Sequence, residues 1–338
     1  MEESPNLVPL HYSPTERQVS PDLEQYKHIL IWANALPRYQ KVARYHHERL
    51  LVRGNEHGFD VDMELTEPTL EDNKNIITDL DPATIIAIVG GDGTASMAMR
   101  AAYELGLDNP FMILNGGNAK NQGRMHHHSR HFYRPERILR SGHIRQVYPL
   151  VESKTFPYGS TQTDLAFAYT TKGLTAKATA GFNTPGHRVD VEDAPNYKRA
   201  IEEAKITIEA LRNTVPFIIH EQGKAARVAA EYGLVSGELM AKYMRFPANS
   251  FAKEAVVVEA PDVKPLTVGR TVVSLALPFA RHRHDWLAEG EQFEVKLVSI
   301  DGSDIYTESD GDASTDPSGT SYSYSISDKS VNVISSRS

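Results

Sequence analysis

The chain has 338 residues, of which 36 are Lys or Arg and 44 are Asp or Glu, so its formal net charge is −8. This acidic balance excludes a generally basic nucleic-acid binder, and the length predicts two domains, each with its own core. There is no cysteine, which excludes disulfides, a thiol nucleophile and a Cys-based zinc site. No apolar run approaches the roughly 20 residues of a membrane-spanning helix, and the acidic, proline-containing start is unlike a signal peptide. We therefore expect a cytoplasmic protein.

The first half of the chain begins with an arm and continues with an alternation of strands and helices. Residues 1–26 are polar and rich in proline, which predicts a flexible arm. From residue 27 to residue 150, apolar runs typical of buried strands alternate with helix-forming segments. The strands are expected at 28–32, 61–65, 85–89 and 110–114, with helices at 43–52, 73–80 and 95–105. This alternation predicts an α/β domain whose parallel sheet is covered on both faces.

Strand patterns dominate the second half, apart from one long amphipathic helix expected over 196–212. The predicted strands lie at 163–170, 216–220, 255–258, 271–277, 293–298 and 305–308. Near the C-terminus, alternating apolar residues at 322–326 and 331–333 predict a closing hairpin rather than a disordered tail. We therefore expect a mainly antiparallel β-sandwich domain over residues 151–334.

The strongest local signal is a buried strand that runs into Gly90-Gly91-Asp92-Gly93-Thr94 and then into a helix. Glycines let the backbone approach a ligand closely, and the helix start offers unpaired amides and a positive dipole end, a geometry that holds phosphate. The turn is not a Walker loop, because no Gly-Lys-Ser/Thr follows, and it is not the spaced-glycine dinucleotide fingerprint. An ordinary tight strand-to-helix turn is the alternative.

This pentapeptide matches the hallmark of the diacylglycerol kinase catalytic-domain superfamily, which includes bacterial lipid kinases, sphingosine kinases and, more distantly, NAD kinases. The resemblance implies an α/β nucleotide-binding domain and a β-sandwich domain, with the active site in the cleft between them. It also implies that the pentapeptide holds the phosphates of ATP. Asn34, in the turn after the first strand, and Thr66, after the second, resemble the residues that line the nucleotide.

A second glycine turn follows one strand later, where the family has another phosphate-contacting element. Gly116 and Gly117 would allow close approach, and an Asn side chain can bridge backbone and phosphate. The family's Thr and Asp are missing here, and either Asn118 or Asn121 is the aligned asparagine. The alternative is a Gly-Asn loop without a ligand.

Late in the chain, Asp310-Gly311-Asp312 resembles the family's strand that ends in Asp-Gly-Glu. The final carboxylate of that element is the family's proposed proton acceptor, which places Asp312 in this role, with Asp92 of the first turn as a second catalytic candidate. An Asp is one methylene shorter than a Glu but can still take a hydroxyl proton. An exposed hairpin turn is the alternative, since Asp-Gly pairs are common in hairpins.

Two expectations concern metal. At the place of the family's structural magnesium, the sequence has Lys253 and Glu254, so we expect that site to be lost, replaced by an internal ion pair or shifted to Glu254. The catalytic Mg²⁺ would then arrive with ATP. The run His126-His127-His128-Ser129-Arg130-His131 has no interleaved carboxylate, which favours a surface or phosphate-facing basic patch over a metal site.

Two further segments carry charge or replace a family residue. Arg281-His282-Arg283-His284 is expected to be a solvated loop, with an anion-binding rim as the alternative. Thr175 stands where the resemblance expects the Asp of a Gly-x-Asp-Ala turn. The helix at 196–212 is expected to pack in the core rather than to anchor the protein to a membrane, because its polar face mixes acidic and basic residues.

The resemblance implies an ATP-dependent kinase that transfers the γ-phosphoryl group to a hydroxyl of a lipid or lipid-like acceptor. ATP and Mg²⁺ are the expected cofactors, contact with a membrane surface would be transient and peripheral, and a homodimer is compatible with the sequence. Two alternatives stay open. One is an NAD kinase, and the other is a nucleotide-binding regulatory homologue that has lost turnover.

Overall fold

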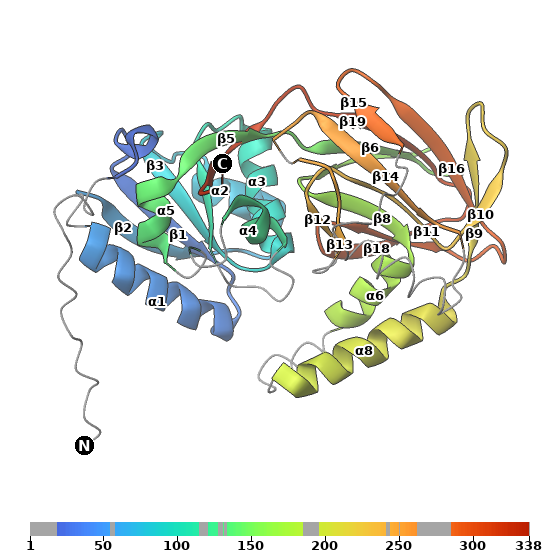
Figure 1. Ribbon diagram of the computed structural model, residues 1–338, viewed down its shortest axis with the longest axis horizontal. Coiled ribbons are helices and arrows are strands. Elements are labelled where there is room, and N and C mark those ends of the chain that lie inside the picture. Colours follow the sequence, from blue (N-terminus) through green and yellow to red (C-terminus); the bar gives the residue numbers. More distant parts are fainter. Residues whose placement is uncertain are drawn as a thin grey trace.

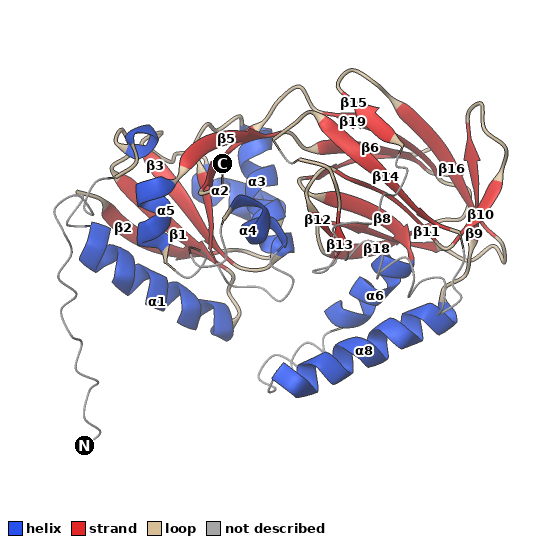
Figure 2. Ribbon diagram, viewed as in Figure 1, coloured by secondary structure: helices blue, strands red, loops and turns tan. Residues whose placement is uncertain are grey.

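The computed structural model describes residues 19–54, 58–114, 121–127, 131, 134–184, 196–240, 244–249, 251–261 and 285–337. The N-terminal part is built from a sheet with helices on both of its faces, and the C-terminal part is built mainly from strands (Figures 1 and 2). The predicted fold class is confirmed: an α/β domain with a mainly parallel sheet is followed by antiparallel sheets.

The first sheet has the strand order β2-β1-β3-β4-β20-β5. All pairs from β2 to β20 are parallel, and only β5 runs antiparallel to its neighbour. All six residues of β3 are buried, as expected of a central strand covered on both faces. The strands are β1 (His28–Ala33), β2 (Asp60–Leu65), β3 (Thr84–Val89), β4 (Phe111–Leu114), β5 (His143–Val147) and β20 (Val331–Ser335).

Helices cover both faces of this sheet and create two apolar cores. Successive residues of β3 point to opposite faces, so Ile85 and Ala87 belong to one core, and Ile86 and Ile88 to the other. The first core includes residues of α1 and α5, and the second includes residues of α2 and α3. The helices are α1 (Pro37–Gly54), α2 (Leu70–Ile77), α3 (Asp92–Leu105), α4 (Asn121–His126) and α5 (Pro135–Ser141).

The two ends of the described chain both pack against this domain, which differs from the sequence expectation. The closing hairpin is wrong, because β19 (Ser321–Ile326) lies in the second domain, whereas β20 returns to the first sheet between β4 and β5. Of the predicted arm, residues 1–18 lie outside the described residues, but Ser20, Leu23 and Tyr26 are buried. A short 3₁₀ helix (Pro21–Leu23) there buries Leu23 completely. The division of the chain at residue 150 stays a prediction.

The second domain contains two six-stranded sheets, with the orders β10-β9-β16-β19-β6-β7 and β15-β14-β11-β8-β17-β18. Buried residues from both sheets form one shared apolar core, so the sheets pack as a sandwich. The first sheet comprises β6 (Leu150–Thr155), β7 (Thr161–Ala166), β9 (Phe217–Glu221), β10 (Arg227–Ala229), β16 (Phe293–Ser299) and β19. The second comprises β8 (Tyr169–Gly173), β11 (Glu231–Val235), β14 (Glu254–Ala260), β15 (Trp286–Ala288), β17 (Ile305–Ser309) and β18 (Asp312–Asp316).

Two of the predicted strands have different outcomes in the structure. The strand predicted at 163–170 is wrong as a single element. It bends at Phe167 and Ala168 and divides between β7 and β8, which lie in different sheets. The strand predicted at 271–277 lies outside the described residues. The described strands also include a small ribbon of β12 (Leu239–Met240) and β13 (Met244–Arg245).

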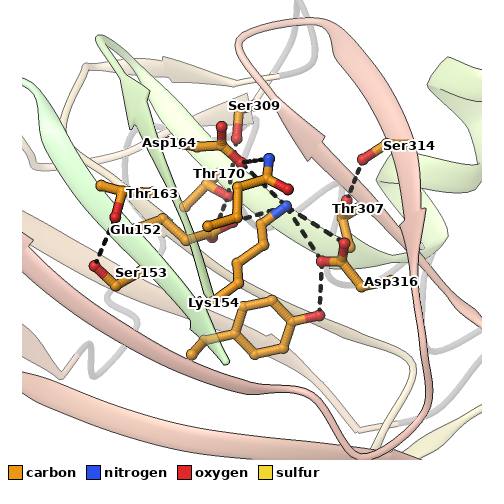
Figure 3. A network of polar contacts seen from close by, with 12 residues as sticks. Glu152, Ser153, Lys154, Thr163, Asp164, Thr170, Thr307, Ser309, Ser314 and Asp316 are labelled. Atoms are coloured by element: carbon orange, nitrogen blue, oxygen red, sulfur yellow. Dashed lines mark hydrogen bonds and ion pairs between the residues drawn. The ribbon is translucent and has the colours of Figure 1, made fainter. Parts of the chain in front are cut away.

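A network of charged side chains lies inside the sandwich (Figure 3). The Nζ atom of Lys154 lies 3.2 Å from a carboxylate oxygen of Asp316 and 3.3 Å from one of Asp164. Glu152 accepts a 2.6 Å bond from the fully buried Lys172. Although burial opposes ionisation, the two lysines lower the pKa of Glu152. Opposite charges therefore compensate one another, as buried ions require.

The same network reaches the first domain. Arg100, on α3, lies 3.4 Å from Asp164 of β7. This ion pair helps to fix α3 against the sandwich. Because α3 begins at the glycine turn, the pair also helps to fix that turn.

Two helices, α6 (Leu174–Asn183) and α8 (Asn196–Asn213), pack against one another at the outer side of the second sheet (Figure 1). Among the described residues, no helix is both long enough and apolar enough to span a membrane.

Candidate active site

The glycine turn joins the end of β3 to the start of α3. Gly91 is the N-cap of α3, and no side chain caps this helix end. A Cβ atom on Gly90 would lie 2.5 Å from the Cβ of Thr94, so close packing of Thr94 against the turn requires glycine there. The uncapped helix start leaves its first amides directed at the end of the sheet, which suits an anion.

Two of the predicted nucleotide-lining residues lie beside this turn. The amide Nδ2 of Asn34 donates a 3.0 Å hydrogen bond to Oγ1 of Thr94. Thr66 is buried, and its backbone N–H donates to the carbonyl of Ala33, the residue before Asn34. The carboxyl ends of β1, β2 and β3 thus bring Asn34, Thr66 and the glycine turn to one edge of the sheet, as parallel strands do.

Asp92 has a structural partner that the sequence did not reveal. Its two carboxylate oxygens each accept a 3.1 Å bond from a backbone N–H, one from Asn121 and one from Gln122. These N–H groups belong to the first turn of α4 and have no partner within that helix, so Asp92 caps the start of α4. The same bonds place the buried Asn121 beside the glycine turn. Burial raises the pKa of Asp92, although the two amides act in the opposite direction. Gly116, Gly117 and Asn118 lie outside the described residues.

A hairpin of the second domain reaches the same turn. Asp310 and Gly311 connect β17 to β18 with φ values of 50° and 95°, the left-handed pair that suits a two-residue Asp-Gly turn. A Cβ atom on Gly93 would lie 2.9 Å from Oδ1 of Asp312, and one on Gly311 would lie 3.6 Å from the backbone nitrogen of Gly93. The structure therefore places Asp312 directly beside Gly93, across the junction of the two domains. The turn is a hairpin, but not the exposed one of the alternative, because Asp310 is completely buried.

Asp310 holds this hairpin in place. Its side chain is completely buried and accepts bonds from three consecutive backbone N–H groups, those of Phe167, Ala168 and Tyr169, at 2.5 to 3.0 Å. It also accepts a 2.7 Å bond from the hydroxyl of Ser96 on α3. Burial raises the pKa of Asp310 to about 6. One carboxylate thus ties together β17, the β7–β8 bend and α3 of the other domain.

A further acid, Glu308, lies just before this turn. Its side chain is buried, and the phenol of Tyr169 donates to it at 2.8 Å. Burial, together with the nearby Asp310 and Asp92, raises the pKa of Glu308 to about 7. Tyr169 and Ser96 were missed by sequence reasoning, because neither belongs to a motif. Only Glu308 could have been found from the sequence. It is an acidic residue inside a predicted strand that leads into the Asp310-Gly311 turn.

The two metal-related expectations have different outcomes. Lys253 pairs with the exposed Glu289 and lies over the ring of Tyr148 at 4.9 Å, so the expected internal ion pair is not seen, and the loss of the magnesium site stays a prediction. The basic patch is wrong for His126 and His127, which are both buried. Burial lowers the pKa of His126 to about 3, so its ring is neutral. In the part of the chain that the structure describes, no group of three or more His, Cys, Asp or Glu could hold a metal ion.

Other predicted segments are placed as follows. His128, Ser129 and Arg130 lie outside the described residues, as do residues 281–284. The N–H of Thr175, which stands where the resemblance expects an Asp, donates a 2.8 Å bond to a carboxyl oxygen of Glu231 on β11. The buried Glu231, on a neighbouring strand, therefore accepts a bond from a backbone N–H in the first turn of α6.

Glu231 makes the stability of the protein depend on pH. Burial raises the pKa of Glu231 to about 8, from an ordinary value of 4.5. Between these two values the folded chain keeps a proton that the unfolded chain releases, so this group lowers the free energy of unfolding as pH rises. We expect Glu231→Gln, which keeps an acceptor for the N–H of Thr175, to remove this decline. Denaturant unfolding at about pH 5 and about pH 8 measures it, and the decline should shrink by on the order of 2–4 kcal/mol.

The matched control is Glu294→Gln, which changes an exposed glutamate on β16. It should leave the pH dependence of unfolding as in the unaltered protein. A Glu231→Gln protein with an unchanged pH slope would show that Glu231 is ionised in the folded state.

Comparison with known proteins gives matches only at the level of structure. No protein-family model matches the chain, and no curated protein does. A diacylglycerol kinase from Bacillus anthracis str. Sterne superposes with a TM-score of 0.59 at 14% identity, over 91% of this chain and 96% of that one. Yeast NADH kinase complexed with NADH gives a TM-score of 0.50 at 9% identity, over 92% of this chain and 83% of that one. The chain therefore has the fold that the sequence resemblance predicts.

Proposed function

We propose that the protein is an ATP-dependent kinase that transfers the γ-phosphoryl group of ATP to a hydroxyl of a lipid or lipid-like acceptor. The observation that carries the proposal is the contact between the two domains, where the Asp310–Asp312 hairpin lies against the Gly90–Thr94 turn. A phosphate-binding turn and a carboxylate able to accept a proton are the two parts that phosphoryl transfer to an alcohol needs in one place. The likeness in fold to a diacylglycerol kinase supports a lipid acceptor.

The residues have separate roles in this proposal. The amides of Gly90, Gly91, Gly93 and Thr94 would hold the phosphates of ATP, and Asn34 and Thr66 would line the nucleotide. The loop of Gly116, Gly117 and Asn118, followed by Asn121, would contact the phosphates from the other side. Positioned backbone donors stabilise the charge that develops on the transferred group.

Asp312 would take the proton of the acceptor hydroxyl. The oxygen of that hydroxyl would bond to the γ-phosphorus while the bond from this phosphorus to ADP breaks and ADP leaves. Asp92 would act indirectly, since both of its oxygens already hold the start of α4. Magnesium would enter with the phosphates of ATP and neutralise part of their charge.

The direct test is phosphoryl transfer from labelled ATP to a panel of acceptors. We expect a labelled lipid phosphate when the acceptor is a diacylglycerol or a long-chain amino alcohol. We expect no NADP when the acceptor is NAD. Production of NADP faster than lipid phosphate would favour an NAD kinase. ATP binding without any transfer would favour the regulatory homologue.

The matched variant for this test is Gly91→Val. A side chain at the N-cap of α3 would occupy the space where a phosphate approaches the turn, so ATP binding and transfer should both be lost while the chain stays folded. Calorimetry measures the binding and circular dichroism the fold. Unchanged ATP affinity in a folded Gly91→Val protein would remove the basis of the kinase proposal.

A further inference from the structure

The outer face of α8 is unlike the buried helix that the sequence predicts. The helix packs on α6 through a small apolar contact that includes Ala210 and Leu211. On its other side, Ile201 is 51% exposed and Ile208 is 46% exposed. These two isoleucines are seven residues apart, so they lie two turns apart along one line of the helix. The structure therefore corrects the expectation of a core helix.

Basic residues are interleaved with the two isoleucines. Lys198, Lys205 and Arg212 are all exposed and also follow one another at a spacing of seven. Each of them is three or four residues from an exposed isoleucine, so the two lines are neighbours on the same face. Glu202, which pairs with Lys205 at 2.5 Å, and Glu209 lie beyond the basic line. In a chain of net charge −8, this face combines apolar side chains with a local row of positive charge.

We propose that α8 docks on the surface of an anionic phospholipid bilayer, with its axis along the surface. Ile201 and Ile208 enter the boundary of the acyl chains, and Lys198, Lys205 and Arg212 contact the headgroup phosphates. An apolar stripe flanked by basic residues is the pattern of a helix that lies at the membrane interface. The charge complementarity selects an anionic lipid surface over a neutral one.

Docking through α8 would bring the candidate site close to a membrane. This role of the docking rests on the proposed lipid acceptor. Helix α6 lies between α8 and the sandwich (Figure 1). The last residue of α6, Asn183, donates a 3.0 Å bond from Nδ2 to the carbonyl of Gly311, in the hairpin that carries Asp312. A bilayer on the outer face of α8 would therefore be separated from the hairpin by α8 and α6, on the side of the second domain that carries Asp312.

The test is sedimentation of the full chain with vesicles of phosphatidylcholine, with or without phosphatidylglycerol. The unaltered protein should sediment with the anionic vesicles only. The double variant Ile201→Ser/Ile208→Ser should lower the partition coefficient by about tenfold or more. Lys205→Gln/Arg212→Gln should lower it by roughly fivefold for each charge removed. The control Val228→Ser/Ile300→Ser changes two other exposed apolar residues and should bind as the unaltered protein does.

Several results would overturn the docking. These are equal binding to neutral vesicles, no binding to either kind, and anionic binding that the α8 variants leave unchanged. Self-association that is lost in the isoleucine variant, without vesicle binding, would assign the face to a second copy of the chain.

Transfer to a detergent-dispersed lipid, measured on the same proteins, separates the docking from the proposed function. Transfer without vesicle binding refutes the docking alone. Vesicle binding without lipid phosphorylation supports the docking and refutes the proposed acceptor.

Discussion

Replacing Asp312 by Asn should lower turnover by roughly 10²–10⁴-fold while ATP binds as before. Asn keeps the size and polarity of the side chain but cannot accept the proton of the acceptor hydroxyl. The carboxylate lies at the start of β18 beside Gly93, outside the buried part of the hairpin, so its loss should leave the fold intact. Single-turnover transfer from labelled ATP measures the effect, and equilibrium binding of ATP measures the part that should not change.

Two companion variants sharpen this test. Asp312→Glu introduces the residue of the resembling family, and its activity should be close to that of the unaltered protein if the backbone is placed as in that family. Gly93→Ala leaves the carboxylate in the chain but would place a Cβ 2.9 Å from Oδ1 of Asp312, so the side chain must move away. We expect its turnover to fall as well. A fully active Asp312→Asn enzyme would refute the assignment, whatever the companions do.

The sequence predicted the parts of the site that are local. An apolar strand followed by Gly90 to Thr94 is visible in a single stretch, and the structure has β3, the turn and α3 where these residues stand. The Asp-Gly hairpin was also visible, because the turn type demands residues that tolerate positive φ. These features depend on neighbours in the chain and on the period of apolar residues.

What could not be predicted depends on residues that are distant in sequence. Ser96 contacts Asp310 across 214 positions, and nothing in either segment signals the other. Strand β20 has an ordinary alternating pattern, which suits a hairpin with β19 as well as a place in the first sheet. The burial of His126 likewise follows from packing against Phe251, a residue of the other domain, at 5.6 Å between ring centroids. Such partners are set by tertiary structure alone.

Asp310 offers the second large effect, on stability rather than on proton transfer. Asp310→Asn keeps a residue that accepts the φ of 50°, and one oxygen can still accept from Ala168 and Tyr169. An amide group would replace the oxygen that now accepts from Phe167 and Ser96. The buried N–H of Phe167 then faces another donor, so we expect the free energy of unfolding to fall by about 1–3 kcal/mol. Asp310→Ala, which removes every acceptor and adds backbone strain, should cost more.

The control Ser96→Ala removes only the bond from α3 and should cost about 1 kcal/mol. A double-mutant cycle with Asp310→Asn then isolates the coupling between the two domains. Asp312→Asn should lower the free energy of unfolding less than Asp310→Asn, because Asp312 is exposed, so the two neighbouring carboxylates separate into one that holds the hairpin and one that takes the proton. If Asp310→Asn instead abolished turnover without any loss of stability, the proton acceptor would be Asp310. The four donors around its carboxylate would then have to open during the reaction, which amide exchange of Phe167, Ala168 and Tyr169 would detect.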